Sequence, residues 1–379
     1  MGNKLEKIAG QILSGCRSVA FDGITPVYTP DAKGFYQSMY WRDFCYTIEG
    51  FGKKIPIGEL ELAVRYLLEP LKEGATFLHK CRNADGKIEF NWQDPYPSED
   101  VSSSATASFS FSADNPMFAV KVVDEYLRLG GEVSLFKEYL VRLERVMKLV
   151  PLSDNNLVED NVGPYMYGFY DTISLTGEEC FASLLFYDAS LRLARIFHKI
   201  GEEKKAELWQ NYAEKTKSGL NLLWNKNAGM FISDTRTNRQ IDVWGSAFAV
   251  YLESISDVQA EAISRWFVKN FDRCVKWGHV RHIPYPEYWK GPFTEVVYPR
   301  IQPYGHYQNG GYWSVPTPWV VRTIALTDMV LAKRMVLDLE KSLVDYYMPE
   351  CINEDGSCKL PGYTASAAMG LTALKILEE

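Results

Sequence analysis

Apolar side chains recur at spacings of three, four and seven residues along most of this sequence, which is the pattern of helices with one buried face. Gly, Pro, Tyr and Asn are concentrated between these stretches. Short strand-like runs such as 87–90 are expected to form small hairpins there. The pattern predicts helices at 3–17, 38–51, 57–71, 115–130, 134–149, 177–200, 203–224, 243–254, 256–271, 314–327, 329–347 and 364–378.

Short and long connections alternate between these helices. Short links such as 129–132 and 200–202 predict antiparallel helical hairpins. Loops longer than about 12–15 residues are uncommon in compact domains and usually carry function. Six hairpins with long loops at one end predict an all-α fold, an (α/α)6 toroid whose inner helices form a closed ring. No linker divides the chain, so residues 1–379 are expected to form one domain. The long loops are 18–37, 72–114, 150–176, 225–242, 272–313 and 348–363.

The composition is that of a folded globular protein. The 379 residues are 46% hydrophobic and 23% charged, which excludes a disordered chain. A formal net charge of −7 argues against a nucleic-acid partner, because phosphates require a basic surface. Seven scattered cysteines contain no C-x-x-C pair, so neither a disulfide framework nor a zinc site is expected. No apolar run approaches the ~20 residues of a membrane span, and no signal peptide is recognisable. These features predict a cytoplasmic protein without a membrane partner.

A cluster of unusual residues stands at the start of every second predicted helix. Helix N-caps account for many of the Asp, Asn, Ser and Thr residues in these clusters. Caps do not account for the Tyr or Trp that five of the six clusters also carry. Aromatic rings stack on the C–H faces of sugars while carboxylates and amides bind the hydroxyls, so clusters meeting at one end of a ring predict a saccharide site. The clusters are Tyr40–Asp43, Asp114–Pro116, Tyr167–Thr172, Asp242–Gly245, Tyr307–Trp313 and Pro361–Ser366.

These clusters resemble motifs of the six-hairpin, or (α/α)6-barrel, glycosidases, which include trehalases, N-glycan-trimming glucosidases, glycogen-debranching α-1,6-glucosidases, glucoamylases and α-L-rhamnosidases. Arg42-Asp43 is similar to the Gly-Arg-Asp sugar-binding motif of the debranching enzymes, with Trp41 in place of Gly. Gly168–Asp171 resembles the Gly-Trp-Asp segment that carries the catalytic acid in the trehalase and glucosidase branch. Pro349–Gly356 resembles the Glu-x-Tyr-Asn-Pro segment that supplies the base there. The resemblance implies a glycoside hydrolase.

The residues themselves fit that chemistry. Glycoside cleavage needs a carboxylic acid that protonates the leaving oxygen and a second carboxylate across the sugar ring. Asp171 has aromatic and apolar neighbours in the sequence, which favour the protonated carboxyl, and is the predicted acid. Glu350 stands in a polar loop and is the predicted base that activates water in an inverting reaction. Glu354 competes with Glu350 as the base, and Glu178 is a further alternative.

The predicted partner is a small saccharide, an α-glucoside-like oligosaccharide or glycoside cleaved from its end. No cofactor is expected. No metal ion is expected either, because His279 and His282 lack a third ligand and should line the pocket or bond within their loop. The oligomeric state is left open. The residues expected to bind the saccharide are Trp41, Arg42, Asp43, Asp114, Asn115, Tyr167, Trp244, Gln308, Asn309 and Trp313.

Two other kinds of function fit the same ring. Sugar epimerases of this architecture use paired histidines on inner helices, where this sequence has only His198. A uronyl hydrolase would need a second arginine near Arg42, for which the candidates are Arg239, Arg281 and Arg300. A non-catalytic saccharide-binding protein would need no opposed carboxylates.

Overall fold

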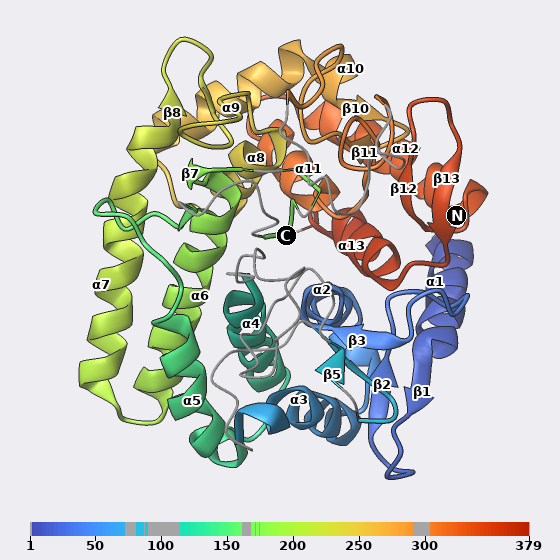
Figure 1. The fold of residues 1–379 in the computed structure, drawn as a ribbon. Coiled ribbons are helices and arrows are strands. Elements are labelled where there is room, and N and C mark those ends of the chain that lie inside the picture. The colour runs from blue at the N-terminus through green and yellow to red at the C-terminus, as the bar shows by residue number, and fades with distance from the viewer. Residues whose placement is uncertain are drawn as a thin grey trace, which may run out of the picture.

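The computed structural model describes residues 2–72, 81–86, 88–89, 114–160, 168–170, 172–173, 175–290 and 304–378. Within this part of the chain six helices form a closed inner ring and six others surround it (Figure 1). The all-α (α/α)6 toroid expected from the sequence is confirmed. The inner helices are α2 (Trp41–Phe51), α4 (Asp114–Arg128), α6 (Cys180–Lys199), α8 (Val243–Tyr251), α11 (Thr317–Ala325) and α13 (Thr364–Lys375). The outer helices are α1 (Gly2–Cys16), α3 (Ile57–Lys72), α5 (Lys137–Met147), α7 (Glu203–Gly219), α9 (Asp257–Lys269) and α12 (Met329–Asp345).

All twelve predicted helices are present, and the differences lie at their ends. The helix expected at 38–51 begins at Trp41 because Ser38–Tyr40 forms strand β3, which pairs with β4 (Cys81–Asn83). The helix expected at 177–200 begins at Cys180 because β7 (Gly177–Glu178) pairs with β6 (Glu159–Asp160). A short helix that the sequence did not predict, α10 (Phe271–Cys274), follows α9.

Small antiparallel hairpins occupy the long connections. The strand-like run at 87–90 contributes β5 (Ile88–Glu89), which pairs with β4. The remaining hairpins are β1 (Arg17–Val19) with β2 (Pro26–Tyr28), β8 (Trp224–Asn225) with β9 (Met230–Phe231), β10 (Val275–Lys276) with β11 (His279–Val280), and β12 (Pro349–Ile352) with β13 (Cys358–Pro361).

Burial separates the inner helices from the outer ones. In α4 every residue from Asp114 to Leu127 is buried. In the outer helix α7 the buried positions are Ala206, Trp209, Ala213 and Thr216, a single stripe. A helix buried on all sides belongs inside a protein, whereas one with a single apolar stripe turns that stripe inward. In the described parts of the chain, no helix is long and apolar enough to cross a membrane.

The ring closes where the last inner helix meets the first. α2 and α13 come into backbone contact at Gly50, where a Cβ atom would collide with the carbonyl oxygen of Ala368. The outer helix α1 packs against both α13 and α12, so the first and last helices of the chain lie side by side (Figure 1). The two ends of the chain therefore contribute to the same wall of the toroid.

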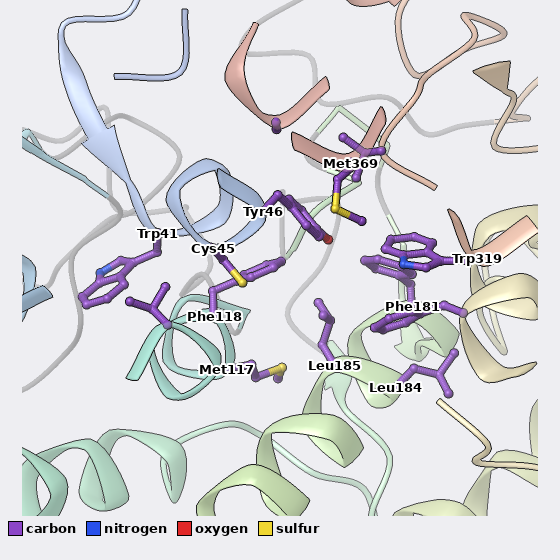
Figure 2. Packing of buried hydrophobic residues seen from close by; sticks show 14 of the residues in the cluster. Trp41, Cys45, Tyr46, Met117, Phe118, Phe181, Leu184, Leu185, Trp319 and Met369 are labelled. Carbon is purple, nitrogen blue, oxygen red and sulfur yellow. The ribbon is translucent and has the colours of Figure 1, made fainter. Parts of the chain in front are cut away.

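Aromatic side chains fill the centre of the ring. The ring centroid of Tyr46 on α2 lies 6.3 Å from that of Trp319 on α11, which lies 5.9 Å from Phe181 on α6. Figure 2 shows these side chains converging, with Phe118 of α4 next to Tyr46. Trp41 points away from them and is fully buried in the hydrophobic core. The interior is a packed core that supports the loop-bearing end of the toroid.

Candidate active site

Two inner helices meet through a buried ion pair at their first turns. Nε of Arg42, in the first turn of α2, lies 2.8 Å from Oδ2 of Asp114, the first residue of α4, and Nη2 of Arg42 donates to Oδ1 at 2.9 Å. Asn115 is fully buried beside Asp114. A Cβ atom on Gly168 would lie 4.0 Å from Asp114, so the third cluster also reaches this pair. The first three sequence clusters therefore come together as expected.

The segment around Asp171 is held by Gln308. The backbone N–H and the hydroxyl of Thr172 donate to Oε1 of Gln308 at 3.0 and 2.6 Å, and Nε2 of Gln308 donates to the carbonyl oxygen of Phe169 at 2.9 Å. The predicted acid Asp171 and the predicted sugar contact Tyr167 lie outside the described residues. Gln308 was expected to bind sugar, and its amide is instead engaged on both sides of position 171.

Asp242, at the start of α8, also holds the segment around position 171. The hydroxyl of Tyr170 donates to Oδ1 of Asp242 at 2.8 Å. The same oxygen accepts the backbone N–H of Gly245 at 2.7 Å, so Asp242 is also the N-cap of α8. Burial raises the pKa of Asp242 to about 6, against the opposing effect of these hydrogen bonds. Asp242 is thus a buried carboxyl that positions Tyr170, the residue before Asp171.

An aromatic wall adjoins this segment. The imidazole of His282 stacks on Trp244 with 3.7 Å between ring centroids and meets Tyr170 edge-on at 4.6 Å. Trp313 packs against Trp244 at 5.9 Å. Burial, reinforced by neighbouring Arg281, lowers the pKa of His282 well below 6.5, so the imidazole is neutral. Neither ring nitrogen of His282 has a hydrogen-bond partner among the described residues.

The histidine pair does not act as a unit. Nε2 of His279 lies 3.0 Å from the hydroxyl of Ser342 on α12, whereas His282 faces the aromatic wall. Asn309, another predicted sugar contact, accepts the backbone N–H of Trp289 at 3.0 Å. Asn309 thus joins the loop at 279–290 to the loop at 307–313, whereas His279 joins the former loop to α12.

Glu350 is almost completely buried on strand β12, at 2% exposure. Nζ of Lys359 lies 2.9 Å from Oε2 of Glu350, and the hydroxyl of Tyr307 donates to Oε1 at 3.4 Å. The same ammonium lies 3.6 Å from the centroid of the Tyr307 ring. A cation at this distance stabilises the ionised carboxylate. Glu350 is therefore a buried carboxylate held by a lysine and a tyrosine.

The sixth cluster joins the first at the same place. The hydroxyl of Tyr363, just before α13, donates to the carboxylate of Asp43 on α2. Burial raises the pKa of Tyr363 well above 10, and the negative charges of Asp43 and Glu350 add to the shift. Tyr363 therefore stays protonated and links Asp43 to the surroundings of Glu350.

The two alternative carboxylates have other partners. Glu354 accepts the hydroxyl of Tyr288 at 2.9 Å and lies 3.7 Å from Arg281. Glu178 accepts the hydroxyl of Thr235 and an amide hydrogen of Asn155. Burial acts to raise the pKa of Glu178, but the hydrogen bonds outweigh it, and the net shift is downward. Among the described residues, Glu354 is therefore held by an arginine and a tyrosine, and Glu178 by a hydroxyl and an amide.

Solved structures share this architecture over nearly the whole chain. A GH63 mannosylglycerate hydrolase from Thermus thermophilus, in complex with Tris and D-glycerate, matches with a TM-score of 0.61 at 14% identity, over 97% of this chain and 99% of that one. A glycosidase variant in complex with glucose matches with a TM-score of 0.67 at 12% identity, over 99% of this chain and 97% of that one. The chain has the six-hairpin glycosidase fold. No protein-family model and no curated protein matches its sequence.

The six-hairpin fold accounts for contacts that the motifs alone did not indicate. Asp242 and Tyr170 are 72 positions apart in different loops, and no local pattern signals their hydrogen bond. Lys359 could have been found, because a turn at Asp355-Gly356 between two strand-like runs places it close to Glu350. The sequence indicates His282 only through its spacing from His279, which could suit a metal ion. Its packing on Trp244 depends on how the ring brings the two segments together.

Proposed function

We propose that this protein is an inverting, exo-acting glycoside hydrolase with a single catalytic domain, cleaving a small α-glucoside-like saccharide in the cytoplasm. The observation that carries the proposal is the pair of contacts made by two consecutive residues. Tyr307 contacts Glu350, while Gln308 binds the residues on both sides of Asp171. The segments that hold the two carboxylates required for glycoside cleavage are thus joined through one dipeptide.

Glu350 is the proposed general base. In an inverting reaction the base takes a proton from water while the water oxygen attacks the anomeric carbon. An ammonium beside a carboxylate favours its charged form, and Lys359 lies against one oxygen of Glu350 while Tyr307 donates to the other. Both oxygens of the proposed base are thus held in place.

Asp171 is the proposed general acid that protonates the leaving oxygen. Its role requires a carboxyl held in place, and the flanking residues Tyr170 and Thr172 are anchored to Asp242 and Gln308. Inversion also requires the two carboxyl groups to stand about 6.5–9.5 Å apart, leaving room for one water.

The terminal sugar is proposed to bind beside Asp43, with the Arg42–Asp114 pair behind it. Asp43 is partly exposed and its carboxylate accepts the hydroxyl of Tyr363, and a carboxylate suits the binding of sugar hydroxyls. The aromatic core closes the ring beneath these residues, so a saccharide would enter end-on, which favours exo action. The two solved glycosidases are in complex with small molecules, glucose in one and Tris and D-glycerate in the other.

The test is hydrolysis of a panel of aryl α- and β-glycosides and α-linked disaccharides, followed by NMR of the first sugar released. We expect release from an α-glucoside-like member with inverted anomeric configuration. Asp171→Asn and Glu350→Gln should each abolish turnover while leaving saccharide binding measurable by calorimetry.

Glu354→Gln and Glu178→Gln serve as matched controls, because they remove carboxylates outside the Tyr307–Gln308 contacts. Turnover retained in both Asp171→Asn and Glu350→Gln would refute the assignment. Product with retained configuration would refute inversion. Saccharide binding with no hydrolysis of any panel member would favour a non-catalytic binding protein.

A further inference from the structure

A cavity lies at the end of the ring opposite the candidate active site, where the inner helices finish. It has a volume of about 540 Å³ and is lined from the last turns of these helices and the short connections after them. Small-molecule sites have volumes of about 300–1,000 Å³. The candidate active site uses the first turns of the same helices, so the two sites are separate.

The wall of this cavity is basic although the chain is acidic. Seven basic and two acidic residues line it, while the whole chain carries a formal net charge of −7. Its deepest cations are paired. Nζ of Lys121 lies 3.0 Å from Glu49, and Nη1 of Arg192 lies 2.7 Å from both Asp124 and Glu125.

The arginines at the rim are paired as well. Arg322 lies 2.6 Å from Glu253, and Arg128 lies 3.0 Å from Glu125. These pairs offset the charge of both arginines. The excess positive charge of the lining therefore belongs to the lysines.

Three lysines supply that excess. Lys53 and Lys54 follow α2, Lys375 ends α13, and all three are exposed. None of them forms an ion pair with a carboxylate in the described parts of the chain. The backbone contact at Gly50 and Ala368 holds α2 and α13 together, so these lysines share one side of the cavity.

Basic residues at helix C-termini also offset the negative end of the helix dipole. That role does not require a cavity. Leu129, Leu252 and Ile376 also line the cavity and are partly exposed, as is Tyr251. Leu129 lies beside Gly52 and Ile376 follows Lys375, so apolar side chains adjoin the lysines. Ammonium groups beside apolar side chains in a ligand-sized space fit a molecule with an anionic end and an organic body.

We propose that this cavity binds a small organic phosphate, such as a nucleotide or another phosphate ester. The phosphate lies against Lys53, Lys54 and Lys375, because the lysine ammonium binds phosphate as a point charge. The organic body packs against Leu129, Leu252 and Ile376. The site is independent of the proposed glycosidase reaction.

Calorimetric titration of the full chain with ATP and with inorganic tripolyphosphate tests the site directly. We expect one ATP per chain, with an affinity that falls as salt is added, and weaker binding of tripolyphosphate. Combining Lys53→Gln, Lys54→Gln and Lys375→Gln should weaken ATP binding by about tenfold or more, the equivalent of about 1.4 kcal/mol.

The matched control combines Lys269→Gln, Lys333→Gln and Lys341→Gln, three exposed lysines of the outer helices α9 and α12. It should bind ATP as the unaltered protein does. Absence of saturable binding of both probes would refute the site, and equal weakening in the control would refute its location. Equal affinity for ATP and tripolyphosphate would refute the contact with an organic body.

Discussion

Lys359 contacts two side chains of the candidate active site. It forms an ion pair with Glu350 and lies over the ring of Tyr307. Lys359→Met would keep most of the side-chain volume but leave a buried carboxylate without its cation. We expect kcat to fall about tenfold or more, because the carboxylate loses the cation that holds it. Lys359→Arg keeps the charge and should keep most of the activity. Steady-state kinetics of both variants measure this, and an unchanged kcat in Lys359→Met would separate Lys359 from the reaction.

Gln308 offers a test of positioning. Gln308→Ala removes three hydrogen bonds from the segment that contains Asp171. Because a displacement of about 1 Å can lower a rate about 100-fold, we expect a loss of that order in kcat with a smaller effect on KM. Gln240 is the matched control, a buried glutamine with hydrogen bonds to the backbone of Tyr288 and Lys290. Steady-state kinetics of both alanine variants should show the kcat loss in Gln308→Ala alone, and equal losses would contradict the prediction.

Asp242 should give stability a specific pH dependence. Burial raises its pKa from 3.8 to about 6, so the folded protein binds this proton more tightly than the unfolded chain does. The resulting stabilisation is complete below about pH 4 and is lost as pH rises through about 6. Asp242→Asn removes this titration but keeps an oxygen for Tyr170 and Gly245. We expect the variant to be more stable at neutral pH, by up to about 3 kcal/mol. Urea unfolding from pH 4 to pH 7 measures this, and parallel curves for the two proteins would contradict it.

At the scale of the elements, helices could be predicted and their first residues often could not. Apolar periodicity is local, so every predicted helix is present. Ser38–Tyr40 looks like the start of α2 but pairs with Cys81–Asn83, and that pairing depends on residues about 40 positions away. α10 contains only Phe271–Cys274, which is too short for a 3.6-residue period to appear. The wrong boundaries therefore fall where long-range pairing or a single turn decides the structure.

Gly50 sets how closely α2 and α13 approach. Gly50→Ala would place a methyl group against the carbonyl oxygen of Ala368, and overpacking of this kind costs about 1–3 kcal/mol. We expect thermal unfolding to shift down accordingly. Gly10→Ala is the control, because a Cβ atom there meets nothing within 4 Å and should stabilise α1 by about 0.5–1 kcal/mol. Destabilisation by both substitutions would mean that helix contact is not the cause.

At the scale of the whole molecule, the position of the site followed from one inference about topology. If alternate helices form an inner ring, the clusters at their starts must lie at the same end of it. In the structure, contacts of Arg42, Gln308 and Tyr363 involve five of the six clusters. The partners within the site did not follow. Thr172 and Gln308 are 136 positions apart, and which amide meets which backbone group depends on how the loops fold over the ring. The sequence therefore predicted that these segments meet, but not which residue contacts which.

The packing of α1 against the last two helices gives a prediction for the molecule as a unit. Leu5, Ala9 and Ile12 of α1 are fully buried against the C-terminal part of the chain. Ile12→Ala should lower the free energy of unfolding by about 2–5 kcal/mol, because it removes buried methyl groups and leaves a cavity. Leu337→Ala, at a position 64% exposed on α12, should change it by less than about 0.5 kcal/mol. Because every wall of a closed ring supports its neighbours, circular dichroism and tryptophan fluorescence should still report one coincident transition in Ile12→Ala. Two separated transitions would show that the α1–α13 wall unfolds by itself and that the toroid is not one cooperative unit.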